Sequence, residues 1–354
     1  MVAQRPSLVG DGWFLEIDFM SNWLFQILSV GLLASFSGLN VAADEKEPAQ
    51  KEGAKSRHFE FTYATTVKGL PPGKMARVWI PVATSSSVQK VTMDKDSTNL
   101  PDYKIGQEKQ YGNQILYVEA KADDKGQIPL HVTYDVKRYE VKTKGSPSLK
   151  PAAGEKIARL LEPDDKVPLV GKPLTLLKDK KVANDPMEAA RLFYDVVNRH
   201  MRYSKEGTGW GRGDVVWACD SKYGNCTDFH SLFISLARAH KIPAKFEIGF
   251  PLPPERGAGK VPGYHCWAWF LPEGKGWVPV DISEANRHPK LTEYYFGNLT
   301  EDRVMFSSGR DIQLVPPQKG PPLNFFIYPY VEVDGKTYPP ANVINSFSFR
   351  DLSK

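Results

Sequence analysis

The sequence predicts an α+β fold, in which an antiparallel β-sandwich-like part precedes a part that mixes helices with antiparallel strands. Apolar and polar residues alternate in several early runs, which is the pattern of strands with one buried face. The alternating sets are Phe59/Phe61/Tyr63, Val78/Ile80/Val82 and Leu130/Val132/Tyr134/Val136. Later segments instead repeat apolar residues at helical spacing behind helix-capping residues. We therefore expect a β domain first and a helix-containing domain after it.

Changes in composition predict the boundaries of these parts. Residues 58–142 carry the strand pattern, and residues 143–182, rich in lysine, proline and glycine, are expected to link the two domains. The second domain is expected over residues 183–335, followed by a polar C-terminal tail over 336–354. Residues 44–57 are charged and poor in apolar side chains, so they are expected to form a disordered linker.

The first 43 residues have the features of a secretory signal peptide. An apolar run from Trp23 to Leu33 is followed by small residues that end in Val41-Ala42-Ala43, a cleavage site of the A-x-A type. Residues 1–19 lack the positive charge of a leader, so we expect Met20 to be the true start. Polar residues interrupt the apolar run and argue against a stable membrane span, although a retained N-terminal anchor is the alternative. The expected location is therefore outside the cytoplasm, in the periplasm or secreted.

Composition limits the classes of partner. The chain has 354 residues, of which 41% are hydrophobic, which is enough for two domains with full cores. Its net charge is +5, and loss of residues 1–43 would remove one basic and three acidic residues and so raise it to +7. This modest excess of positive charge is compatible with binding to acidic polymers of a cell surface. Interleaved basic and aromatic residues are absent, which argues against nucleic acid as a partner.

The chemical signals are densest between Tyr223 and Asp281. Asn225 is a good helix N-cap, so Cys226 is expected in the first turn of a helix. Unpaired N–H groups at a helix start stabilise a thiolate and can hold an oxyanion. A single cysteine is nevertheless often a buried packing residue. Cys226 alone therefore leaves a structural and a nucleophilic role open.

His265 and Asp281 extend the pattern. They lie on two predicted strands that Gly274-Lys275-Gly276 would join as a hairpin. Adjacent antiparallel strands can bring the two side chains together, so that the carboxylate fixes the tautomer of the imidazole. Each residue alone fits a structural role. A thiol, an imidazole and a carboxylate in this order instead indicate nucleophilic catalysis by cysteine.

The other two cysteines leave several arrangements open. Cys219 and Cys266 could form a disulfide, or Cys219 and Cys226 could form a redox pair. A metal site of Cys219, Cys226 and His230 lacks tight ligand spacing and a fourth ligand, so no metal and no cofactor are expected. With three cysteines in an exported protein, at least one thiol is unpaired, which is consistent with a catalytic thiol.

Four motifs in this order resemble the transglutaminase-like superfamily, and in particular its exported bacterial members, over about residues 57–335. The motifs are Gly224-Asn225-Cys226-x-Asp228, Arg238-x3-Ile242-Pro243-Ala244, His265-x-Trp267-Ala268 and Gly276-Trp277-x-Pro279-x-Asp281. The resemblance implies a papain-related α+β domain, that is, the fold of papain-like cysteine proteases. It also implies that Cys226 is the nucleophile, His265 the base and Asp281 the group that orients the base.

The resemblance also suggests where an oxyanion could bind. In the cross-linking members of the superfamily a tryptophan contributes its indole N–H to this site. Trp210, in the glycine-rich loop 207–214, and Trp217 are therefore candidates, although neither matches the family spacing. Asn225, next to the nucleophile, is the third candidate for the oxyanion site or the cleft wall.

We therefore expect an exported thiol enzyme that forms a thioester with a carboxamide or peptide carbonyl and passes it to water. Its substrate would be a protein or peptide, for example of the cell envelope. One alternative is a cross-linking acyltransferase, in which an amine takes the acyl group. Another is a non-catalytic exported protein- or glycan-binding protein that keeps the fold, but the intact Cys-His-Asp set argues against it.

Overall fold

The computed structural model describes residues 55–144 and 148–352. The expected signal peptide and most of the expected linker over 44–57 lie outside these residues, but Ser56 already belongs to the first strand. The helices are α1 (Pro186–His200), α2 (Val215–Ser221), α3 (Cys226–Ala239) and α4 (Ile282–Arg287), with 3-10 turns η1 (Ile157–Leu161), η2 (Lys172–Leu177), η3 (Pro289–Leu291) and η4 (Pro340–Asn342). The strands are β1 (Ser56–Val67), β2 (Met75–Pro81), β3 (Gln89–Asn99), β4 (Tyr103–Gln107), β5 (Gln114–Lys121), β6 (Ile128–Tyr139), β7 (Val141–Lys142), β8 (Arg202–Tyr203), β9 (Tyr223–Gly224), β10 (Ala244–Pro251), β11 (Ala258–Val261), β12 (His265–Phe270), β13 (Val278–Val280), β14 (Asn298–Leu299), β15 (Arg303–Ser308), β16 (Tyr330–Val333), β17 (Lys336–Thr337) and β18 (Val343–Asp351).

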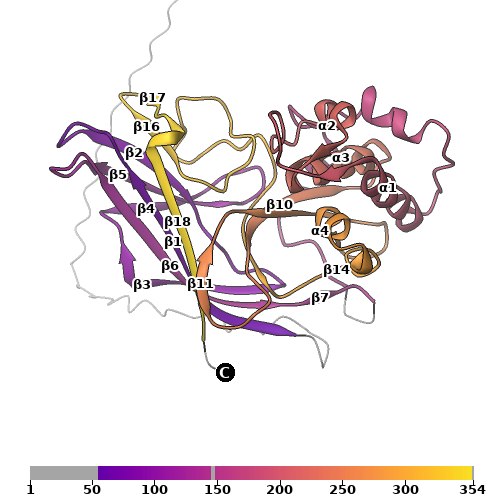
Figure 1. Ribbon diagram of the computed structural model, residues 1–354, viewed down its shortest axis with the longest axis horizontal. Helices are drawn as coiled ribbons and strands as arrows, with labels where there is room; N and C mark the ends of the chain where they lie inside the picture. Colours follow the sequence, from indigo (N-terminus) through magenta and orange to yellow (C-terminus); the bar gives the residue numbers. More distant parts are fainter. Residues whose placement is uncertain (1–54, 145–147, 353–354) are drawn as a thin grey trace, which may run out of the picture. The chain divides into compact units, whose positions relative to one another are not determined.

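Two five-stranded sheets form the β-rich part of the molecule. Their strand orders are β11-β18-β1-β6-β3 and β17-β16-β2-β5-β4, and neighbouring strands are antiparallel (Figure 1). The alternation expected for the first strand is present, because residues of β1 are buried and part-exposed in turn. The inward faces of both sheets contribute to one hydrophobic core. This is the antiparallel sandwich that the sequence predicts.

The C-terminal residues correct one expectation. Residues 336–354 were expected to form a peripheral tail, but β18 pairs with β1 from Phe59↔Asp351 to Val67↔Val343. The aromatic ring of Phe347 packs against Tyr63 and Phe250, with centroids 4.8 and 4.3 Å apart. Phe347 and Phe349 alternate with polar residues and are buried, while the other residues of the strand are exposed or half-buried. The end of the chain is therefore part of the sandwich.

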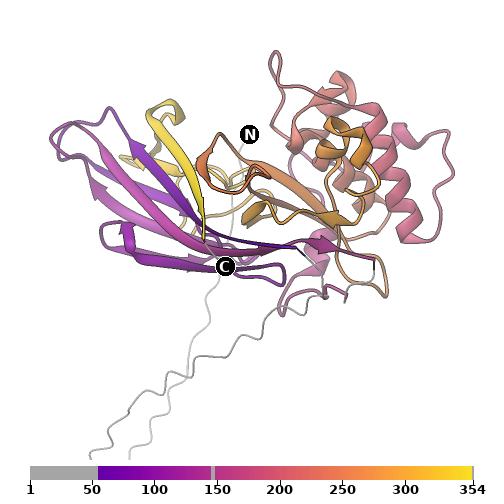
Figure 2. The same cartoon turned by 60° about the horizontal axis from the view of Figure 1, so that its bottom comes forward.

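The helical part is built on a four-stranded sheet of order β13-β12-β10-β15. Helix α3 lies against β12 and β10, and α1, α2 and α4 each contact α3. Figure 2 shows these helices, coloured rose to orange, gathered away from the purple strands of the sandwich. The opposite face of the sheet carries Trp267 and Trp269, which pack against Val88 and Val141 of the β-rich part. The sheet is therefore covered on both faces.

The expected boundary between two domains is crossed in several places. Strand β11, from the helical part, pairs with β18 of the sandwich. The expected linker also packs against the helical part, where the buried Asp164 accepts a hydrogen bond of 2.8 Å from Arg238 of α3. Within the described ranges no helix is long and apolar enough to cross a membrane.

Candidate active site

Cys226 is the first residue of α3, and the local sequence explains its position. The side chain of Asn225 accepts a hydrogen bond of 2.9 Å from the N–H of Thr227, while Asp228 accepts one of 2.9 Å from the N–H of Asn225. This reciprocal capping box fixes where the helix begins. The chain before it must approach Asp228 closely, and a Cβ on Gly224 would collide with that carboxylate. Cys226 is thereby held at the start of the helix, 2% exposed.

His265 and Asp281 meet as the hairpin prediction requires. His265 begins β12, and Asp281 follows β13, which pairs antiparallel with β12. His265 Nε2 donates to Asp281 Oδ2 over 2.8 Å. Asp281 is fully buried and also caps α4, because its Oδ1 accepts from the N–H of Glu284. With Nε2 held in this way, Nδ1 is the nitrogen left for the sulfur of Cys226.

The electrostatics of these three residues favour a thiolate–imidazolium pair. Burial opposes ionisation of Cys226, but hydrogen bonds from Cys266 and His265 outweigh it and lower the pKa of the thiol to about 5. Burial likewise opposes protonation of His265, yet the charge and hydrogen bond of Asp281 and the contact with Cys226 raise its pKa to about 10. The pKa of Asp281 lies well below its usual range despite burial, because His265 and Arg303 stabilise its charge. Between a pH of about 5 and a pH of about 10, the Cys226 thiol is therefore ionised and the His265 imidazole is protonated.

Sequence reasoning did not assign Arg303 to this site. Its Nη1 donates to Asp281 Oδ2 over 3.1 Å, on the same oxygen that His265 uses. Arg303 lies on β15 and is 3% exposed. The sequence gives no local signal for the contact between Arg303 and Asp281, because the two residues are 22 positions apart in the chain. The buried carboxylate is thus shared between two cationic side chains.

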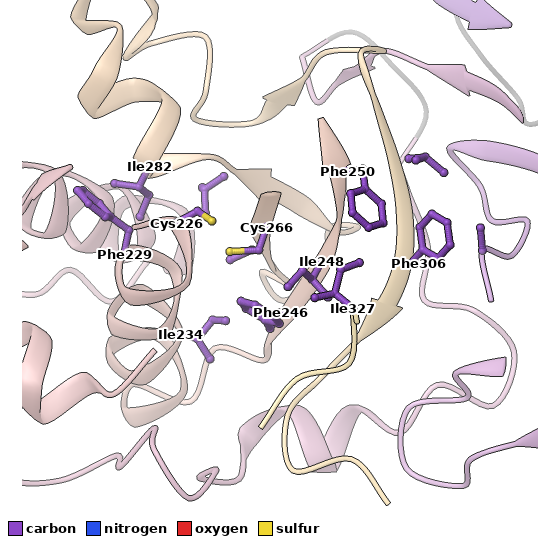
Figure 3. Packing of buried hydrophobic residues seen from close by; sticks show 14 of the residues in the cluster. Cys226, Phe229, Ile234, Phe246, Ile248, Phe250, Cys266, Ile282, Phe306 and Ile327 are labelled. Atoms are coloured by element: carbon purple, nitrogen blue, oxygen red, sulfur yellow. The ribbon is translucent and has the colours of Figure 1, made fainter. Parts of the chain in front are cut away.

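All three cysteines are free thiols, so the disulfide between Cys219 and Cys266 that the sequence left open is not present. Cys226, at the start of α3, and Cys266, in β12, lie where this helix packs against the strand (Figure 3). The thiol of Cys266 donates to the Cys226 sulfur, and this contact and burial place the pKa of Cys266 well above its ordinary value. Cys219 lies on α2, where burial and the charge of Asp220 raise its pKa to about 11.

A second histidine, His230, lies one turn into α3 and close to the same carboxylate. Its Nε2 accepts from the N–H of Ile282 over 3.0 Å and lies 3.8 Å from Asp281 Oδ1. Its Nδ1 is 3.6 Å from the sulfur of Cys266. Burial outweighs the attraction of Asp281 and lowers the pKa of His230 to about 4. His230 is therefore a neutral acceptor.

The three oxyanion or cleft candidates have different surroundings. Trp210 donates its indole N–H to the carbonyl of Gly207 over 3.1 Å, so this donor serves its own loop. Trp217 packs edge-on against Tyr223, with ring centroids 5.3 Å apart. Asn225 is buried, and its Nδ2 donates to the hydroxyl of Tyr264 over 3.0 Å. Of the three, Asn225 is the one that adjoins Cys226 in the chain.

Asp228 ties the glycine-rich loop to the start of α3. Its two oxygens accept from the N–H groups of Gly211 and Gly213, over 2.7 and 2.9 Å. Burial is the main reason that the pKa of Asp228 rises to about 6, although these hydrogen bonds oppose the rise. The glycine-rich loop 207–214 is thus bonded directly to the turn that carries Cys226.

Comparison with known proteins gives one family match and distant structural neighbours. Residues 176–282 match the model of the transglutaminase-like superfamily, a range that includes Cys226, His265 and Asp281. A Haemophilus influenzae protein described as uncharacterized is 25% identical over 92% of this chain and 97% of its own length. The crystal structure of a candidate cysteine protease from Cytophaga hutchinsonii has a TM-score of 0.55, with 14% identity over 86% of this chain and 93% of that one.

A more distant neighbour is the periplasmic domain of TgpA from Pseudomonas aeruginosa, at 15% identity and a TM-score of 0.37 over 70% of this chain and 76% of that one. A likeness of this size carries no argument about fold or location. The Cytophaga structure, by contrast, shares the fold along most of both chains. The chain therefore has the fold of its transglutaminase-like cysteine protease neighbours, and its residues 176–282 are similar to the core domain of the transglutaminase-like superfamily.

Proposed function

We propose that this protein is a cysteine-dependent acyl-transfer enzyme, with Cys226 as nucleophile, His265 as acid and base, and Asp281 as the group that orients His265. The observation that carries the proposal is the 2.8 Å bond between His265 Nε2 and the fully buried Asp281, beside a thiol whose pKa is lowered to about 5. A packing cysteine in apolar surroundings would have a raised pKa, as Cys219 has.

The arrangement supports a two-step reaction. The Cys226 thiolate attacks the carbonyl carbon of an amide, and the oxyanion that forms is stabilised by the backbone N–H of Cys226 at the start of α3. The carbon–nitrogen bond then breaks as His265 gives its Nδ1 proton to the leaving amine, which leaves a thioester on Cys226. Water attacks the thioester while His265 takes up its proton, which releases the acid and restores the ion pair.

We propose a carboxamide or peptide bond in a protein or peptide as the substrate, and hydrolysis as the outcome. The second candidate outcome is transfer to an amine, because the same thioester would serve both. We also propose export, on the basis of the apolar run and the Val41-Ala42-Ala43 site. N-terminal sequencing of the native protein should begin near Asp44. A chain that still carries residues 20–40 would instead be anchored.

Peptide mapping after limited alkylation tests the nucleophile. At pH 6.5 iodoacetamide should label Cys226 at least about 10²-fold faster than Cys219, because only the former is largely ionised there. Cys226→Ala should retain the fold and lose covalent capture of an electrophilic amide probe, whereas Cys219→Ala should keep it. Faster labelling of Cys219 or Cys266 would overturn the assignment of Cys226.

Turnover of an amide peptide in ¹⁸O-labelled water, with and without a primary amine, distinguishes the two outcomes. Hydrolysis predicts one labelled oxygen in the acid product and little amine adduct. A dominant amine adduct would replace hydrolysis by cross-linking while leaving the thiol mechanism in place.

A further inference from the structure

Two buried arginines lie on the sheet face opposite α3. Arg138 of β6 is 0% exposed and Arg303 of β15 is 3% exposed. Their guanidinium carbons lie 5.9 and 4.8 Å from the centroid of the Trp267 ring. Burial and then the charge of Arg303 lower the pKa of Arg138 to about 9, so the two groups interact. The two residues are 165 positions apart in the chain and belong to strands of different sheets, yet both lie beside the ring of Trp267.

Several of their donors have no acceptor among the residues that the structure describes. In Arg138, Nη1 donates to Gln89 Oε1 over 3.3 Å, but Nε and Nη2 have no partner. In Arg303, Nη1 bonds Asp281 and Nη2 bonds the hydroxyl of Thr300, but Nε has no partner. Buried guanidinium donors are costly to leave unpaired, so a set of three from two neighbouring arginines requires a reason.

The carboxylates nearby do not supply the missing hydrogen-bond acceptors. Glu247 is the carboxylate whose charge acts on Arg138, but its Oε2 accepts from the indole N–H groups of Trp267 and Trp269, over 2.8 and 2.6 Å. Its Oε1 lies 3.7 Å from Lys245 Nζ. Asp281, the carboxylate that bonds Arg303, is shared with His265. Within the described part of the chain, no carboxylate is hydrogen-bonded to Arg138.

We propose that a small monovalent inorganic anion of the chloride class binds between Arg138 and Arg303. It would accept hydrogen bonds from Nε and Nη2 of Arg138 and from Nε of Arg303. A water molecule accepts at most two of these hydrogen bonds and leaves the repulsion between the two guanidinium groups in place, whereas an anion accepts all three and offsets the positive charge. The complete burial of Arg138 restricts the ligand to one of a few atoms and excludes phosphorylated or carboxylated metabolites.

The site would also connect with the residues proposed for catalysis, because Arg303 bonds the carboxylate that holds His265. The binding proposal does not depend on that chemistry. It would stand even if Cys226 were not a nucleophile, since its ligands are arginines outside the Cys-His-Asp set.

Thermal unfolding of the full-length mature protein tests the site. Sodium chloride and sodium bromide should raise Tm saturably, by about 2–4 °C at ten to a hundred times the dissociation constant. Sodium gluconate at equal ionic strength should not, because the anion is too large for the site. Arg138→Met should abolish the chloride-specific rise. Arg350→Met should keep it, because Arg350 is an exposed arginine paired with Glu60.

Crystals grown in bromide provide a test that needs no variant and so covers the case in which Arg138→Met does not fold. An anomalous difference peak between the two guanidinium groups is expected. Density there with no anomalous signal would show a water and overturn the proposal. Equal responses of Tm to chloride and gluconate would also contradict it.

Discussion

Two buried histidines from different regions of the molecule lie close to the same carboxylate and have opposite charge states. His265, at the start of β12, donates from Nε2 to Asp281 over 2.8 Å, and its pKa is raised to about 10. His230, in α3, has its Nε2 3.8 Å from Asp281, and its pKa is lowered to about 4. Burial acts in the same direction on both. The difference arises from hydrogen bonds and neighbouring charges, because Nε2 of His230 already accepts the N–H of Ile282 and the charged His265 opposes protonation of His230.

The thiols beside the two histidines also have opposite tendencies to ionise. The charged His265 helps to keep Cys226 as a thiolate, whereas the neutral His230 lies 3.6 Å from Cys266, whose pKa is raised. Two Cys–His contacts in one small region therefore differ in chemistry. Proximity of a histidine to a cysteine is not enough to activate it. The nitrogen that carries the proton, and the group that fixes it, decide the outcome.

Replacement of His265 should have the largest effect on this contrast. In His265→Ala, the thiol loses its imidazolium, and we expect turnover to fall by roughly 10³-fold or more and alkylation of Cys226 at pH 6.5 by about 10²-fold. His230→Gln is the matched control, because the Gln amide oxygen can still accept from Ile282. It should change alkylation by less than about threefold. Equal losses in both variants, measured as alkylation rates against pH, would abolish the distinction between the histidines.

Asp281→Asn should reduce turnover by about 10–10³-fold, because Asn favours the wrong tautomer of His265 and removes its counter-charge. The loss should be smaller than in a serine enzyme, because the thiolate–imidazolium pair exists before attack. The same change leaves Arg303 buried without its partner, so we also expect a loss of about 2–4 kcal/mol in unfolding free energy.

The double variant Asp281→Asn/Arg303→Met separates the two effects of Asp281. It should recover part of the stability, since the unpaired charge is gone, while turnover stays low. Recovery of turnover together with stability would mean that Asp281 acts only through the fold.

The residues that the sequence brought together are those with local structural signals. Cys226 follows an N-cap, and His265 and Asp281 lie on a hairpin, so short-range rules place all three. Arg303 and His230 have no such local signal. Arg303 contacts Asp281 from another strand of the sheet, and the role of His230 depends on which of its ring nitrogens accepts the N–H of Ile282. Trp210 was chosen by resemblance, and the structure gives its indole N–H to Gly207 instead.

The fold shows the same limit. The alternation in residues 59–63 and 130–136 predicted the strands of the sandwich, but not that β18 would pair with β1, nearly three hundred residues earlier in the chain. The Phe347 and Phe349 alternation was a strand signal, although the polar residues around it indicated a tail. Sheet partners far apart in sequence are set by tertiary packing and are not marked locally.

The comparison of histidines predicts a pH dependence of stability. The folded pKa of His230 is about 4, below its ordinary 6.5, so between these values the unfolded chain binds a proton that the folded chain does not. Stability should therefore fall as pH drops from 6.5 to 4, by roughly 3 kcal/mol. Asp228, with a pKa raised to about 6, acts in the opposite direction over part of this range.

The difference between wild type and His230→Gln isolates this contribution, because Asp228 is present in both. Unfolding free energies by denaturant titration from pH 4 to 7 should give a shallower slope in the variant. Parallel curves would show that His230 does not stay neutral in the folded state.

The smallest expected effect concerns Cys266, whose S–H donates to the Cys226 thiolate. A hydrogen bond to the charged form of a group favours that form, so Cys266→Ala should raise the pH midpoint of Cys226 alkylation by about 0.5–1 unit. Cys266→Ser keeps a donor at the same place and should leave the midpoint near or below that of wild type. Above pH 7 all three proteins should react at similar rates, because the imidazolium of His265 still holds the thiolate. A shift in Cys266→Ala as large as that in His265→Ala would mean that the neighbouring thiol, and not the charged histidine, activates Cys226.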